Sequence, residues 1–173
     1  TATLVRIESC TNNGSLDPVG FVDVTPLVNQ IDGQGNATPH VTIYNVPYLR
    51  IQGGTSAIIL DPKAGDIGVC VFASRDITKV KSTKKQANPG SWRQYSFSDG
   101  LYLGGMLNGT PEQYIQFNNT GVTITAPLVT INANVQVNGS VVATGDVTGQ
   151  GTSLHTHKHG GVQAGSNQTD VPV

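Results

Sequence analysis

The feature that most constrains the fold is a long alternating segment in the C-terminal half of the chain. From Val122, apolar residues occupy every second position through Leu128, and after a one-residue slip the alternation runs from Val129 to Val137. Thr, Asn and Gln fill most of the positions between them. A period of two is typical of a β-strand with one apolar face, and it argues against an amphipathic helix.

This segment has no evident partner within its own chain. A lone strand cannot bury its apolar face, and the residues that follow are turns and a histidine-rich stretch. We therefore expect burial against other copies, in an intertwined β-helix of identical chains whose strand edges pair with one another. An amyloid-like stack would use the same pattern, but the regular glycine breaks and the globular region before them favour a closed oligomer.

The composition is typical of an all-β chain. Charged residues make up 12% of the sequence, about half of the usual share of roughly 25%, and 21 glycines accompany many Thr, Val and Asn residues. Residues 1–75 contain about five short strand-like segments, separated by Gly, Pro, Asn and Asp turns. That number and spacing predict a small Greek-key barrel such as an OB-fold, or a fragment of a β-sandwich. Periodicity alone does not separate the two.

Three regions follow from these patterns. Residues 1–100 are the OB-fold-like domain, 101–150 a strand-rich neck with the β-helix, and 151–173 the tip. Within the first region, residues 74–100 read as a long connection with one helical turn between Asp76 and Val80. The lysine-rich run in this connection is interpreted as a solvated loop.

Several functional classes are disfavoured by the sequence. A formal net charge of −1 argues against nucleic acid as a partner, because phosphate binding needs a basic excess. No nucleophile elbow, zinc-protease motif or phosphate loop is present, and the acidic residues are scattered among turns, so we expect no enzyme. There is no apolar run of about 18 residues, so no membrane helix is expected. The first residues lack a basic-then-apolar pattern, so no signal peptide is expected. Cys10 and Cys70 are expected to be free thiols in a protein made in a cytosol, and a single bridge between them is the alternative.

The tip carries the candidate metal ligands. His155, His157 and His159 stand at every second position, so in an extended strand they would share one face. A His-x-His pair from each of three chains would supply six imidazoles. Six nitrogens suit an octahedral iron(II) ion, with nickel or cobalt next, and suit four-coordinate zinc poorly. Such an ion keeps no open position, and we expect a structural site.

Two groups of residues resemble a known family. At the C-terminal end these are residues 145–148 (GDVT), 153–154 (SL), 157–163 (HKHGGVQ) and 165–166 (GS). Nearer the N-terminus they are residues 18–24 (PVGFVDV), 26–30 (PLVNQ), 65–68 (GDIG) and 72–76 (FASRD). The first group is similar to the tip of the central spike proteins of contractile-tailed bacteriophages, of the baseplate assembly protein V type. The second resembles the membrane-puncturing spike subfamily of a phage that infects encapsulated Escherichia coli.

The resemblance implies a homotrimer with an OB-fold domain, a triple-stranded β-helix and a pointed, metal-pinned tip. It implies one iron ion per trimer, held by six histidine nitrogens from three chains, with His157 and His159 as the matching pair. His155 is an extra histidine, which leaves His155 and His157 as the alternative pair.

The implied role is mechanical. The spike sits under the tail tube among other baseplate proteins, is assembled in the host cytoplasm as part of the virion tail, and is driven through the host outer membrane. A receptor-binding tail fibre or adhesin would also be a β-rich trimer, but this tip lacks an exposed aromatic loop. A tail-associated envelope hydrolase would need a catalytic constellation, and none is recognisable in the sequence.

Overall fold

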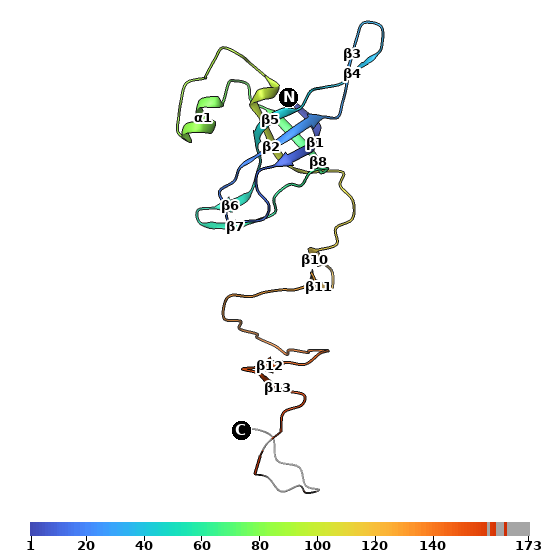
Figure 1. Ribbon diagram of the computed structural model, residues 1–173, viewed down its shortest axis with the longest axis vertical. Helices are drawn as coiled ribbons and strands as arrows, with labels where there is room; N and C mark the ends of the chain where they lie inside the picture. The colour runs from blue at the N-terminus through green and yellow to red at the C-terminus, as the bar shows by residue number, and fades with distance from the viewer. Residues whose placement is uncertain (159, 162–164, 166–173) are drawn as a thin grey trace. The chain divides into compact units, whose positions relative to one another are not determined.

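The computed structural model describes residues 1–158, 160–161 and 165 of the chain (Figure 1). It divides into two compact units, Thr1–Tyr114 and Ile115–Val173, and each is considered by itself. Strands dominate the described residues, which contain one short α-helix, α1 (Thr78–Thr83), and one 3-10 turn, Phe97–Asp99. The expected all-β class is confirmed.

The first unit is built on a five-stranded antiparallel sheet with the order β5-β2-β1-β8-β9. Its strands are β1 (Ala2–Cys10), β2 (Phe21–Pro26), β5 (Ile43–Pro47), β8 (Ile67–Phe72) and β9 (Gly100–Gly105). The sheet curls until its two edges meet. Tyr48 and Tyr102 form a parallel bridge, and the Leu49 N–H donates to the Tyr102 carbonyl at 2.8 Å. Two small hairpins extend from the sheet: β3 (Gln30–Ile31) with β4 (Ala37–Thr38), and β6 (Ile51–Gly53) with β7 (Ser56–Ile58).

The core lies on the concave face of this sheet, and the sequence alternation produces it directly. In β2 and in β8 every second residue is buried and the residues between are half-buried. The cluster consists of Val5, Ile7, Val22, Val24, Ile43, Val46, Tyr48, Cys70, Phe72 and Tyr102. Because successive strand residues point to opposite faces, this alternation brings the apolar residues of β1, β2, β8 and β9 together. Strand β5 adds Ile43 and Val46, which are three positions apart. Cys10 and Cys70 carry free thiols.

Gly68 allows the close crossing of β8 and β9. A Cβ at this position would collide with the Tyr102 ring and with the Gly104 carbonyl. Gly104 itself has φ +138, a conformation that L side chains rarely adopt. The absence of a side chain at Gly68 lets the Tyr102 ring pack over β8 and join the core.

The connection between β8 and β9 is anchored by Arg93. Its guanidinium donates to Asp99 through Nε at 2.7 Å and to Asp76 through Nη2 at 2.9 Å. Asp99 is fully buried, and Asp76 is 5% exposed. The two carboxylates also accept the backbone N–H groups of Ile77 and Thr78, and α1 begins at Thr78. This helix lies close to the helical turn expected between Asp76 and Val80.

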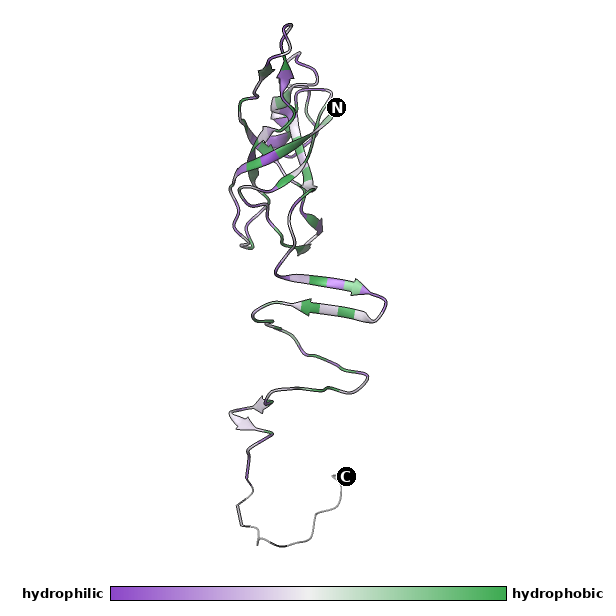
Figure 2. Ribbon diagram, turned by 90° about the vertical axis from the view of Figure 1, so that its right-hand side faces the viewer, coloured by the Kyte–Doolittle hydropathy of each residue, from purple (hydrophilic) through white to green (hydrophobic). Residues whose placement is uncertain are grey.

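The second unit contains two short hairpins, β10 (Tyr114–Asn118) with β11 (Gly121–Thr125) and β12 (Thr148–Gly149) with β13 (Thr152–Ser153). Residues 126–147, all of which are described, form no strand. Figure 2 shows hydrophobic residues alternating with more polar ones along β10 and β11. None of the described residues from 115 onward is buried. Val129, Ile131, Val135 and Val137 are between 51% and 64% exposed, so this part of a single chain has no core.

Candidate metal centre

The β12–β13 hairpin leads into the histidine stretch. Thr148 pairs with Ser153 and Gly149 with Thr152, which leaves two residues, Gln150 and Gly151, in the turn. Both have positive φ, 50 and 81. Positive φ at both central residues is the geometry of the tight hairpin turns that match strand twist. The hairpin therefore fixes Ser153, which lies two residues before His155.

Ser153 and Asp146 organise the next residues by accepting their backbone N–H groups. Ser153 Oγ accepts from His155 at 3.1 Å and from Thr156 at 2.9 Å, and Asp146 Oδ1 accepts from His155 at 3.2 Å. Hydrogen bonding from the Ser153 side chain, and then from the His155 backbone, holds the pKa of Asp146 below its ordinary value. The carboxylate therefore remains an ionised acceptor to a lower pH than an unpaired aspartate.

These contacts correct one expectation. Residues 154–156 form a turn, which is closed by the His157 N–H donating to the Ser153 carbonyl at 3.2 Å. The prediction of one extended segment through the three histidines is therefore wrong for His155. The physical reason is local, because Ser and Asp side chains that accept nearby backbone N–H groups stabilise turns in competition with strands. Gly160 and Gly161 also lie in a turn, with Gly161 at φ 77.

The His157 ring has a defined hydrogen-bonding partner. Its Nδ1 lies 3.0 Å from the Ser153 carbonyl oxygen and 3.1 Å from that of Leu154. A carbonyl can only accept, so we assign the proton to Nδ1. In that neutral tautomer Nε2 carries the lone pair that a metal ion takes. Metal-binding histidines characteristically donate their other ring N–H to a carbonyl or carboxylate, and His157 therefore fits the chemistry of an imidazole ligand.

Within the described part of the chain, His157 is not joined by the rest of the expected donor set. His159 lies outside the described residues. Among the residues that are described, no group of three or more His, Cys, Asp or Glu side chains could hold a metal ion. His155 and His157 both belong to the tip, and His157 is common to both candidate ligand pairs. The described part of a single tip thus holds two imidazoles, those of His155 and His157.

Residues 151–173 match a family model described as the GpV Apex motif. The match supports the interpretation of the chain as a phage baseplate spike protein. It confirms the resemblance inferred from the tip residues, and it begins at Gly151, in the turn of the β12–β13 hairpin. No curated protein matches the chain.

The matched motif has known properties in gpV-like spikes. The Apex motif is the metal-binding tip motif of gpV-like spikes, and it belongs to structural phage proteins and not to an enzyme family. A baseplate spike resides in the virion tail in association with other baseplate components. Across the residues that the structure describes, no helix has the length and apolar character needed to span a membrane.

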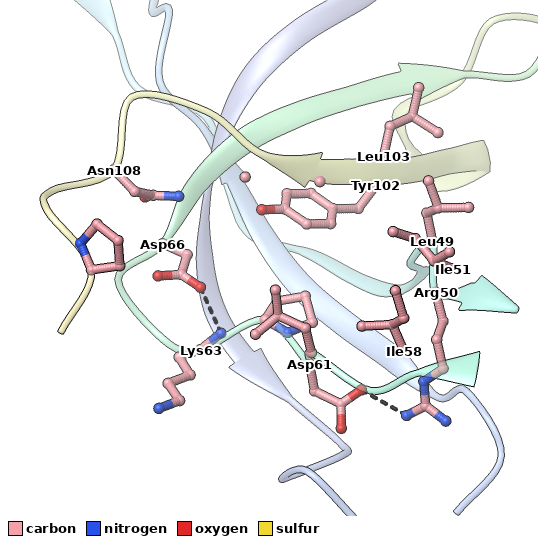
Figure 3. Close-up of a pocket in the computed structure, with 15 residues that line it drawn as sticks. Leu49, Arg50, Ile51, Ile58, Asp61, Lys63, Asp66, Tyr102, Leu103 and Asn108 are labelled. Carbon is pink, nitrogen blue, oxygen red and sulfur yellow. Dashed lines mark hydrogen bonds and ion pairs between the residues drawn. The ribbon is translucent and has the colours of Figure 1, made fainter. Parts of the chain in front are cut away.

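The first unit contains a hollow of about 580 Å³. Figure 3 shows Leu49, Ile51, Ile58 and Leu103 around it, with the ion pair of Arg50 and Asp61 beside them. The pair is nearly inaccessible, with an N–O distance of 2.7 Å. Its spacing of eleven residues gives no sequence signal, and the sequence did not predict it.

The hydrogen bonding of Asp61 argues for a structural role. Its Oδ1 accepts from the Tyr48 hydroxyl at 2.6 Å and from Arg50 Nη2, and its Oδ2 accepts from the Gly14 N–H at 2.9 Å. Burial alone would raise the pKa of Asp61, but the hydrogen bonds from Tyr48 and Arg50 outweigh burial and lower it. A carboxylate that is kept ionised and has both oxygens engaged is poorly suited to proton transfer.

Proposed function

We propose that this chain forms the homotrimeric central spike of a contractile tail baseplate, and that the spike pierces the host outer membrane mechanically during infection. The observation that carries the proposal is the exposed apolar alternation of the second unit, directly ahead of a segment that matches the GpV Apex motif.

The trimer is supported by the surface that a single chain leaves open. Between Val122 and Val142, nine large apolar side chains are exposed in the lone chain, and burying one fully stabilises a fold by about 1.5–3 kcal/mol. Residues 126–147 also have backbone groups without strand partners in a single chain, and backbone N–H and C=O groups need partners when they are buried. Three chains wound as a triple-stranded β-helix would satisfy both requirements.

The first unit is, in this proposal, an OB-fold-like barrel that contacts the other baseplate and tail tube proteins. Five antiparallel strands in a non-sequential order support this assignment, because OB-folds are five-stranded, partly open Greek-key barrels. The meeting of the two sheet edges at Tyr48 and Tyr102 adds to this support.

The tip is proposed to bind one iron ion per trimer through His157 and His159 of each chain. When bound, the ion supplies a cross-link between the three tips. The Nδ1 contact of His157 supports this role, since it sets the tautomer and orientation of the ring before any metal arrives. Six imidazoles leave no position for water or substrate, and the proposed site is therefore structural.

Mechanical piercing requires stiffness and no catalytic group. A trimer whose backbone groups pair across chains and whose tips are cross-linked resists fraying under load. We further propose that it is assembled in the host cytoplasm, and the free thiols of Cys10 and Cys70 are compatible with a reducing compartment.

Single substitutions of the three histidines test the metal assignment. Purified His157→Ala and His159→Ala proteins should lose iron by elemental analysis and remain trimeric by native mass spectrometry, because the apolar interface is separate from the tip. His155→Ala and the control Thr156→Ala should keep the metal. Iron lost from His155→Ala but kept in His159→Ala would select the alternative pair. Full metal content in His157→Ala would refute both pairs.

A further inference from the structure

Positive charge is concentrated in the connection between β8 and β9. Six of the ten Lys and Arg residues lie between Arg75 and Arg93, together with one acidic residue, Asp76. The rest of the chain therefore holds four basic and ten acidic residues. Arg93 is neutralised by its ion pairs with Asp76 and Asp99. The other five cations of the connection form no ion pair with any described residue.

Three of these cations line a groove between α1 and the sheet, which we call the basic groove. It has a volume of about 630 Å³ and is lined by Pro18, Val19, Gly20, Phe21, Pro47, Gln52, Val80, Lys81, Lys84, Lys85 and Gln86. Lysines therefore share the groove with apolar side chains from the start of β2 and the end of β5. Val80, the one large apolar residue of α1, is 45% exposed and belongs to this lining.

The wall of the groove is held in place before any partner binds. Lys81 Nζ donates to the Asn45 carbonyl at 3.3 Å, which ties α1 to the barrel. Lys84 ends the helix in the left-handed conformation, with its N–H donating to the Val80 carbonyl at 2.8 Å. On the N-terminal side, Asp76 is fixed by Arg93. A surface that is already ordered loses little conformational entropy on binding.

The lining favours one class of occupant. A membrane surface would require an apolar helix face to enter the interface, but the apolar residue of α1 lines the groove. Single-stranded nucleic acid would require stacking platforms, and Phe21 is the one aromatic side chain in the lining. A second copy of this chain offers no acidic segment, because its closest acidic residues in sequence, Asp61 and Asp66, are five positions apart.

We propose that the basic groove binds an extended acidic segment of a partner protein, with one apolar side chain of that segment against Val80. The lysines supply charge complementarity, which governs specificity and association rate. The apolar lining supplies a seat for a single side chain. This surface lies wholly within the first unit, and the inference is independent of the metal and of the β-helix.

The test uses the full chain and a fluorescent peptide of sequence Glu-Glu-Leu-Glu-Glu, with Gln-Gln-Leu-Gln-Gln as the uncharged probe, in fluorescence anisotropy at low and high salt. The acidic peptide should bind and the uncharged one should not. The double variant Lys84→Gln, Lys85→Gln should weaken binding at least about fivefold. The control Arg75→Gln, Lys79→Gln removes the same charge from the same connection but outside the groove, and should weaken binding by no more than about twofold.

Val80→Ser tests the apolar seat, and it should weaken the leucine peptide more than a peptide with Ala in place of Leu. Circular dichroism checks that each variant is folded. If the two double variants lost equal affinity for the acidic peptide, binding would depend on the total charge of the connection and not on the groove, which would overturn the proposal. So would an absence of peptide binding, or binding of duplex DNA or lipopolysaccharide vesicles that depends on Lys84 and Lys85 and exceeds that of the peptide.

Discussion

Ile131 offers the sharpest test of whether the second unit is buried between chains. In a lone chain its side chain is 60% exposed, and truncating a surface residue changes stability by no more than about 0.5 kcal/mol. A trimer that buries the remaining surface would gain about three fifths of the free energy of burying an isoleucine side chain completely, and the truncation removes this contribution. This corresponds to about 1–2 kcal/mol per chain, or roughly 3–6 kcal/mol per trimer.

The perturbation is Ile131→Ala, measured as the dissociation constant of the trimer by native mass spectrometry over a dilution series. A loss of roughly 3–6 kcal/mol weakens assembly by about two to four powers of ten, and the cavity left behind shifts the effect towards the upper end. The matched control is Asn132→Ala, the neighbouring polar position of the alternation, which should leave assembly within about twofold of the original value.

The outcome separates two physical states of the segment. A large effect at position 131 with little at 132 is what one apolar face buried between chains requires. Equal effects at the two positions, or no effect at either, would mean that Ile131 stays in solvent. The exposed alternation would then carry no argument for a β-helix.

Three further predictions concern the first unit. Arg93→Met leaves the buried carboxylates without their cation, and should lower the urea midpoint more than Arg6→Met, which breaks a half-exposed pair; equal midpoints would contradict this. Hydrogen bonds from Thr78 lower the pKa of Asp76 to about 2, so its contribution to stability is present above the ordinary value of 3.8 and is lost as pH falls towards 2. Hydrogen exchange in the connection should accelerate over that window, and Asp76→Asn should remove the transition. Burial raises the pKa of the Cys70 thiol to about 11, and iodoacetamide should therefore modify Cys10 first, with Cys70 reacting after unfolding.

The sequence predicted those parts of the fold that depend on local pattern. The alternation around Val22 and around Cys70 marks strands with one buried face, and both lie in the core. The order of the strands in the sheet is not a local feature, because the bridge between Tyr48 and Tyr102 joins residues far apart in the chain. Side-chain alternation specifies which face of a strand is buried, but it carries no information about which strand lies next to it.

The ion pairs and the turn at the histidines were also not predictable from sequence patterns. Arg93 joins carboxylates that lie seventeen and six residues away. Because Arg93 itself lies in no helix or strand, no periodic pattern marks these contacts. At the tip, the alternating histidines predicted an extended segment, but Ser153 and Asp146 accept the backbone N–H of His155 and close a turn there. These side-chain hydrogen bonds, and not the alternation of the histidines, determine the local backbone structure. His157, which the sequence did select, has the ring contact that suits a metal ligand.

The most direct test of the proposed spike is the native mass of the purified full chain, combined with elemental analysis of the same sample. The proposal predicts a particle of three chains containing one iron ion, held by six histidine nitrogens. A monomer without a transition metal would contradict both the β-helix and the shared tip site.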